Sequence, residues 1–132
     1  MTTPARRNST LLGAAHRALR ERDLSALGAM MSDDVVWHVA GQSRVSGEYT
    51  GRSAVADYHR QLVELSKGTF SLEDEDLLDS DERAVSLCRV SGQREGKTLD
   101  ADYCEVIRVG DGRIAEGWSF AFDQYAFDLF WV

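Results

Sequence analysis

The sequence predicts an α+β domain, because helical patterns fill the first half of the chain and strand patterns fill the second. Before Gly68, apolar residues recur every three or four positions, as Val55, Tyr58 and Leu62 do. After Gly68, short segments with the period of strands are separated by turn residues. The Asp-Gly pair at residues 111–112 is a typical two-residue hairpin turn. We therefore expect separate helices packed against an antiparallel sheet.

Three helices are predicted in the first half of the chain. The first begins at Thr3-Pro4, since proline is tolerated in a first helical turn. A short second helix follows Asp23, whose carboxylate can cap its first turn. The third begins at Ser53 and stops at residues 67–68. Each has an apolar stripe that we expect to face inward: Leu12, Ala15 and Leu19; then Leu24, Leu27, Met30 and Met31; then Val55, Tyr58, Leu62 and Leu65.

Strands are predicted over residues 35–39, 69–78, 83–92, 98–109 and 113–122. Residues 41–53 contain three glycines and are predicted to form a loop. Alternation along the last strand places Trp118, Phe120 and Phe122 on one face and Ser119 and Asp123 on the other. We expect the aromatic tail that follows to be ordered, with Phe127, Phe130 and Trp131 buried.

Composition narrows the class of protein. A chain of 132 residues with 28% charged and 43% hydrophobic residues is typical of one globular domain, here residues 1–132. The net charge of −7 argues against nucleic acid and anionic membranes as partners. Neither a membrane-spanning run nor a secretory start is present, which predicts a cytoplasmic protein. Cys88 and Cys104 are expected to be reduced core residues.

No metal or cofactor is expected. His16, His38 and His59 fall on three separate predicted elements without the spacing of metal ligands. The acidic run at residues 73–82 lacks the glycine and the alternating ligands of a calcium loop, and is better explained as a solvated strand edge. Neither a phosphate-binding glycine loop nor a Ser-x-x-Lys nucleophile motif occurs.

Several stretches resemble one family. DDVVWHVAG followed by SGEYTGRSAV, and VIRVGDGRIAEGW running into DQYAFDLFW, resemble SnoaL-like proteins of the nuclear transport factor 2 superfamily, to which ketosteroid isomerases are related. The resemblance covers residues 11–131. It implies a cone-shaped α+β barrel in which N-terminal helices pack against a strongly curved, mostly antiparallel sheet. It also implies a cavity for a small apolar molecule and a homodimer formed through the sheet face.

The resemblance marks two positions for catalysis. In SnoaL-like cyclases it implies a catalytic Asp directly after the Trp of the last long strand, and an assisting His on the preceding strand. This chain has Ser119 and Glu105 there. A carboxylate that enters an apolar cavity has a raised pKa, so Glu105 is the first candidate for a catalytic base or acid. Alternatively, Glu105 faces solvent or forms a structural ion pair, for example with Arg89.

Two further residues are candidate catalytic groups. Asp123 can reach the mouth of a cavity as a second carboxylate, or it can cap a short helix that begins at Gln124. His38 can shuttle protons, or it can be a hydrogen-bonded structural residue. Because Trp37 and His38 are neighbours on one strand, only one of them can point into the cavity. The predicted substrate contacts are Trp37, Tyr49, Tyr58, Tyr103, Arg89 and Ser119.

Two hypotheses of different classes follow. The first is a cofactor-free acid/base enzyme of cyclase, isomerase, dehydratase or hydrolase type, acting on an apolar polyketide-like or polycyclic molecule. The second is a catalytically silent dimeric domain that binds a ligand or serves as a scaffold. An epoxide hydrolase is a minor alternative, since that branch implies an Arg-x-Asp pair that LDADYCEVIR lacks and for which Arg89 would have to substitute.

Overall fold

The protein is built on one curved six-stranded sheet, here described from a computed structural model that covers residues 4–132, with side chains from residue 8. The strand order is β2-β1-β6-β5-β4-β3. β1 and β6 are parallel and all other neighbours are antiparallel. The bounds are β1 Met31–Val39, β2 Gly47–Thr50, β3 Ser71–Asp79, β4 Arg83–Arg94, β5 Lys97–Gly110 and β6 Arg113–Ala121.

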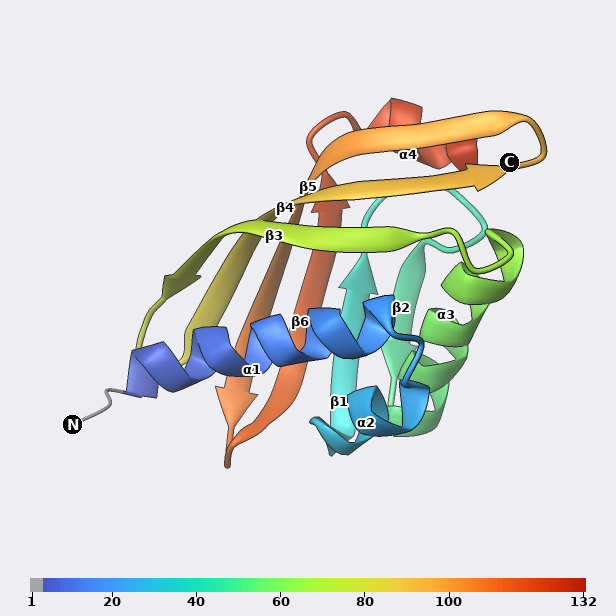
Figure 1. Cartoon of the computed structure of the whole chain (residues 1–132). Helices are drawn as coiled ribbons and strands as arrows, with labels where there is room; N and C mark the ends of the chain where they lie inside the picture. The colour runs from blue at the N-terminus through green and yellow to red at the C-terminus, as the bar shows by residue number, and fades with distance from the viewer. Residues whose placement is uncertain (1–3) are drawn as a thin grey trace.

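Helices cover the concave side of this sheet (Figure 1). The helices are α1 Pro4–Arg20, α2 Leu24–Ala29, α3 Arg52–Leu65 and α4 Gln124–Phe130. α1 crosses in front of β3 and β4, whereas α3 packs against β1 and β2. The predicted α+β class and mostly antiparallel curved sheet are therefore confirmed, although the sheet stays open with β2 and β3 at its edges. Thr3, the predicted helix start, lies outside the described residues.

The structure differs from the predicted elements most clearly over residues 41–53. The expected loop at residues 41–53 contains β2, which pairs with β1 so that Tyr49 lies opposite Trp37. The sequence GEYT hides this strand because an exposed edge strand needs no apolar alternation. α3 begins at Arg52 instead of after Ser53, and its N-cap is Gly51 at φ 91°, a conformation that favours glycine.

The aromatic tail is ordered, as predicted. Asp123 caps α4 by accepting a hydrogen bond from the backbone N–H of Ala126 at 3.1 Å. Phe127, Phe130 and Trp131 are all buried. The Phe127 ring centre lies 5.0 Å from that of Tyr103 on β5, so the tail packs against the inner face of the sheet.

Side chains on β6 alternate as predicted. Ser119 and Ala121 are buried on the helix-covered face. On the opposite face Phe120 is 39% exposed and Phe122, just after the strand, is 67% exposed. On β6, the outer face therefore carries aromatic residues and the inner face carries small ones. Within residues 4–132, no helix is long and apolar enough to cross a membrane.

Candidate functional site

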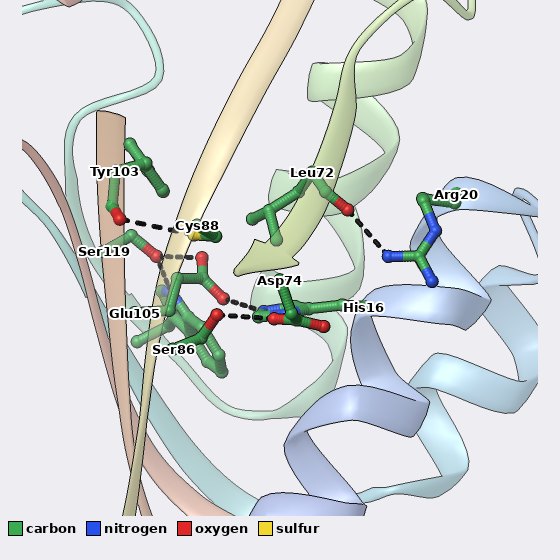
Figure 2. A network of polar contacts seen from close by, with 10 residues as sticks. His16, Arg20, Leu72, Asp74, Ser86, Cys88, Tyr103, Glu105 and Ser119 are labelled. Atoms are coloured by element: carbon green, nitrogen blue, oxygen red, sulfur yellow. Dashed lines mark hydrogen bonds and ion pairs between the residues drawn. The ribbon is translucent and has the colours of Figure 1, made fainter. Parts of the chain in front are cut away.

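A chain of buried polar side chains lies between α1 and the inner face of the sheet (Figure 2). His16 on α1 contacts two carboxylates: its Nδ1 lies 2.6 Å from Asp74 Oδ1, and its Nε2 lies 2.7 Å from Glu105 Oε1. Ser119 on β6 donates its hydroxyl to Glu105 Oε2 at 2.5 Å. Ser86 on β4 donates to Asp74 at 2.5 Å. Together with Trp37 on β1, described next, these residues bring one helix and five strands together at one histidine–carboxylate cluster.

Trp37 extends this chain to β1. Its indole Nε1 donates a hydrogen bond to Ser119 Oγ at 2.7 Å. The Ser119 hydroxyl therefore accepts from Trp37 and donates to Glu105, so its orientation is determined from both sides. This arrangement fixes one oxygen of the Glu105 carboxylate, while His16 fixes the other.

A β-bulge helps to aim Asp74. Between Asp74 and Asp76 the pairing of β3 with β4 shifts by one residue, which leaves Glu75 without a partner position. Asp74 lies opposite Cys88 on the inward-facing side, while Leu77, after the bulge, lies opposite Ser86. The Asp74 side chain therefore points towards His16 on α1. After the bulge, the apolar side chain of Leu77 lies on this same side of the sheet.

The two carboxylates keep His16 protonated. Burial alone lowers the pKa of His16, but the hydrogen bonds and negative charges of Asp74 and Glu105 outweigh it and raise the pKa to about 9. For Asp74, burial raises the pKa, and the hydrogen bond and charge of His16 reverse this effect, so the pKa lies below its ordinary value. Near pH 7 the cluster therefore contains an imidazolium held between two acidic side chains.

An apolar cavity adjoins the cluster. Its aromatic and polar lining comprises Trp37, Tyr58, His59, Phe70, Tyr103, His16 and Glu105, and the rest is aliphatic. The space that the centre of a water molecule can reach inside it is about 10 Å³, which is room for about one water. The cavity is thus almost filled by its own walls in this conformation.

The other titratable groups in the cavity are neutral near pH 7. Burial lowers the pKa of His59 to about 4. Burial, with the nearby charge of Glu105, raises the pKa of Tyr58 well above its ordinary value. Burial also raises the pKa of Tyr103. Two phenol O–H groups and a neutral imidazole therefore face the same space as the Glu105 carboxylate.

The structure brings together five of the residues singled out in the sequence. Trp37, Tyr58, Tyr103 and Glu105 line the cavity, and Ser119 lies directly behind Glu105. Glu105 is only 7% exposed and its ion-pair partner is His16 instead of Arg89. Trp37, and not His38, is the member of that neighbouring pair that points inward.

His38 and Arg89 lie on the outer face of the sheet. The His38 ring stacks on Trp118 with ring centres 5.5 Å apart, and its Nε2 lies 2.7 Å from Glu116. Arg89 donates to Asp100 at 2.7 Å and to Asp102 at 3.0 Å. Strand alternation turns both side chains away from the cavity, so neither contacts a ligand bound there.

Tyr49 and Asp123 have local structural partners. The Tyr49 hydroxyl donates to the Val45 carbonyl at 2.8 Å, and its ring packs 4.8 Å from that of Tyr58. Tyr49 supports the cavity wall through Tyr58 and is not part of the lining. Asp123 is exposed at the start of α4, where it has the capping role considered above.

Sequence reasoning missed His16, His59 and Asp74 as site residues. His16 lies four positions after Leu12 and one after Ala15, on the apolar stripe of α1, and a histidine on such a stripe is a usable signal. His59 follows Tyr58 on the inner side of α3. Asp74 could not be told from its acidic neighbours, because only the bulge and the partner helix distinguish it. Among residues with described side chains, no cluster suited to a metal ion is found.

Fold and site together define an α+β protein whose curved sheet and helices enclose a small apolar cavity with a buried histidine–carboxylate cluster. The fold is that of nuclear transport factor 2-like proteins. The chain belongs to the SnoaL-like domain family, whose profile matches residues 12–117. The resemblance inferred from the sequence is thereby confirmed. A search of curated protein sequences finds no significant match.

Several solved structures have the same fold. Bal32a, from a soil-derived mobile gene cassette, is 29% identical with a TM-score of 0.95 over 98% of this chain and 100% of its own. A protein of unknown function with a cystatin-like fold from Xanthomonas campestris is 31% identical with a TM-score of 0.88 over 94% of this chain and 98% of its own. TerC, co-crystallised with polyporic acid, is 20% identical with a TM-score of 0.82 over 94% of this chain and 97% of its own, and shares the fold.

Proposed function

We propose that this protein binds a small apolar molecule in the cavity beside Glu105 and acts on it as a cofactor-free acid/base enzyme. The observation that carries the proposal is a buried carboxylate that faces two phenols in a largely apolar cavity. Burying a charged carboxylate costs free energy, so its presence in the cavity wall favours a functional role. TerC, which has the same fold, was co-crystallised with polyporic acid, so a small-molecule ligand is compatible with this fold.

In this proposal Glu105 is the catalytic base. Its carboxylate takes a proton from a C–H or O–H group of the substrate, and the protonated Glu105 returns a proton to the product. Each carboxylate oxygen has two lone pairs, so Glu105 can accept from the substrate while it is bonded to His16 and Ser119. The phenols of Tyr58 and Tyr103 would donate hydrogen bonds to a developing oxyanion. Since Asp74 and Ser119 act only through their neighbours, they are positioning residues.

Ligand entry requires the cavity to open. About 10 Å³ of free space is far less than the several hundred cubic ångströms typical of ligand sites. The wall formed by α1 contributes Leu12, Ala15, His16 and Leu19, so an outward movement of this helix would enlarge the cavity.

The same small volume favours the alternative of a catalytically silent domain. Both oxygens of Glu105 already have partners, and the cluster could serve only to hold α1 on the sheet. Such a domain would bind a ligand, or act as a scaffold, without turning it over.

We also propose that two copies associate through the outer face of the sheet. Trp118, Phe120 and Phe122 lie together on that face, and Phe120 and Phe122 are exposed. A second copy would remove this aromatic surface from water. This dimer is independent of the acid/base proposal.

Proton exchange at a carbon acid separates the two functional hypotheses. The bicyclic ketone 2-tetralone has acidic C–H groups beside its carbonyl, and their replacement by deuterium in D₂O is followed by NMR. If Glu105 is a base, the protein accelerates this exchange, and Glu105→Gln lowers the protein-dependent rate by about 100-fold or more. Glu73→Gln is the control, since Glu73 is an exposed residue outside the cavity lining.

The binding of 2-tetralone is measured in parallel through changes in its NMR line widths. Binding without accelerated exchange would favour the silent domain. Exchange that is unchanged in Glu105→Gln would exclude Glu105 as the base.

A further inference from the structure

The charges around the cavity restrict the ligands that it can hold. Glu105 is the one acidic side chain in the described lining, and His16 is the one cationic side chain. The described lining contains neither lysine nor arginine. An anionic ligand would therefore have to rely on His16 for a counter-charge.

His16 has no donor to spare for an anionic ligand. Its two ring nitrogens are at 2.6 Å from Asp74 and 2.7 Å from Glu105, so both N–H groups of the imidazolium are used. The guanidinium of Arg20 donates to the Leu72 carbonyl at 2.8 Å, and its charge contributes to lowering the pKa of Asp74. Figure 2 shows Arg20 turned towards Leu72, on the other side of His16 from Glu105.

Hydrogen-bond acceptors and aromatic rings face the ligand instead. Glu105 can accept from an N–H or O–H donor with its remaining lone pairs. The rings of Trp37, Tyr58 and Tyr103 line the same space, and aromatic faces attract cations. A carboxylate group placed there would meet the Glu105 carboxylate in a medium that screens charges poorly.

We propose that the ligand of this cavity is an apolar molecule that presents an N–H or O–H donor to Glu105 and carries no negative charge, with hydrophobic amines bound most tightly. The inference rests on the proposed binding of a small molecule and adds the chemical class of that molecule. It does not depend on whether the molecule is turned over. The ligand of TerC does not bear on it, because that protein shares the fold alone.

A matched ligand series tests the charge preference. Three molecules with the ring skeleton of 2-tetralone are compared at pH 7 by isothermal titration calorimetry: 2-aminotetralin as the cation, 2-tetralol as the neutral donor and tetralin-2-carboxylate as the anion. We expect the amine to bind at least about 10-fold more tightly than the carboxylate, with the alcohol between them. Glu105→Gln should remove most of the preference for the amine, whereas Glu73→Gln should preserve it.

The outcomes distinguish this inference from the proposed function. Binding of the carboxylate with equal or higher affinity than the amine overturns the charge preference and leaves binding in the cavity standing. A preference for the amine that survives Glu105→Gln overturns the role of Glu105 and places the bound amine elsewhere. If none of these molecules nor 2-tetralone binds, the proposed function fails together with the inference.

Discussion

Gly117 on β6 lies directly beneath the indole ring of Trp37. A Cβ atom built at position 117 would come within 2.4 Å of the ring atoms Cε3 and Cζ3 of Trp37. Because the strand has no side chain here, the indole can lie against the backbone, and its Nε1 reaches Ser119 two residues further along. Because residue 117 has no side chain, Trp37 can reach the Ser119 hydroxyl, which in turn orients the Glu105 carboxylate.

Gly117→Ala tests this relationship. We expect the free energy of unfolding to fall by about 1–3 kcal/mol, since the new methyl group forces the ring out of its position. Chemical denaturation measures the change. Gly110→Ala, near the end of β5, is the matched control because its Cβ would approach only Ala115, at an ordinary 3.7 Å. Equal stability of the two variants would mean that Trp37 moves aside freely.

The raised pKa of His16 predicts that stability falls on the alkaline side. The folded protein binds the His16 proton up to about pH 9, whereas the unfolded chain releases it near pH 6.5. The stabilisation is therefore complete below pH 6.5 and is lost as the pH rises towards about 9, at up to about 1.4 kcal/mol per pH unit. Urea denaturation between pH 6.5 and 8.5 measures this slope. His16→Gln should flatten it, and an unchanged slope would show that another group carries the effect.

The lowered pKa of His59 predicts that stability falls on the acid side. Its pKa is lowered to about 4 in the folded protein, so the unfolded chain binds the proton more readily between about pH 4 and pH 6.5. Stability is complete above pH 6.5 and falls as the pH decreases towards about 4. Denaturation from pH 6.5 to 4.5 should show a shallower slope in His59→Gln than in the wild type. The same acid slope in both proteins would contradict a buried neutral His59.

The outer face of the sheet predicts a dimer that a single charge disrupts. We expect the wild type to sediment as a dimer at micromolar concentration, and Phe120→Glu to sediment as a monomer with an unchanged fold by circular dichroism. Leu78→Glu is the control, since Leu78 is 51% exposed on the edge strand β3. A wild-type monomer would end the proposal, and a dimer that tolerates both charges would place the interface elsewhere.

Much of the fold could be predicted because its long elements have strong local patterns. The stripe of α3 and the alternation on β4 and β6 each indicate one buried face, and the family resemblance supplies their arrangement. Alternation predicts that only one of Trp37 and His38 points into the cavity, but it does not say which one, and it leaves Glu105 either in the cavity or in solvent. The edge strand β2 could not be predicted, because its pairing uses backbone groups that every sequence offers.

The site was harder to predict because its partners are distant in the sequence. His16 and Glu105 are separated by 89 positions, and their contact depends on how α1 crosses the sheet. The way in which α1 crosses the sheet cannot be inferred from the local sequence of either element. Asp74 depends in addition on a one-residue bulge, which changes the face of each side chain that follows it.

The position of His16 on α1, with both of its carboxylate partners on the sheet, makes this helix an electrostatic latch. Any movement that lifts α1 far enough to admit a ligand must pull an imidazolium away from Asp74 and Glu105. Part of the barrier to entry is then coulombic, and it disappears when the imidazolium loses its proton. If ligands enter through this movement of α1, their rate of entry should rise as the pH increases towards the pKa of His16, about 9, even where their equilibrium affinity does not change.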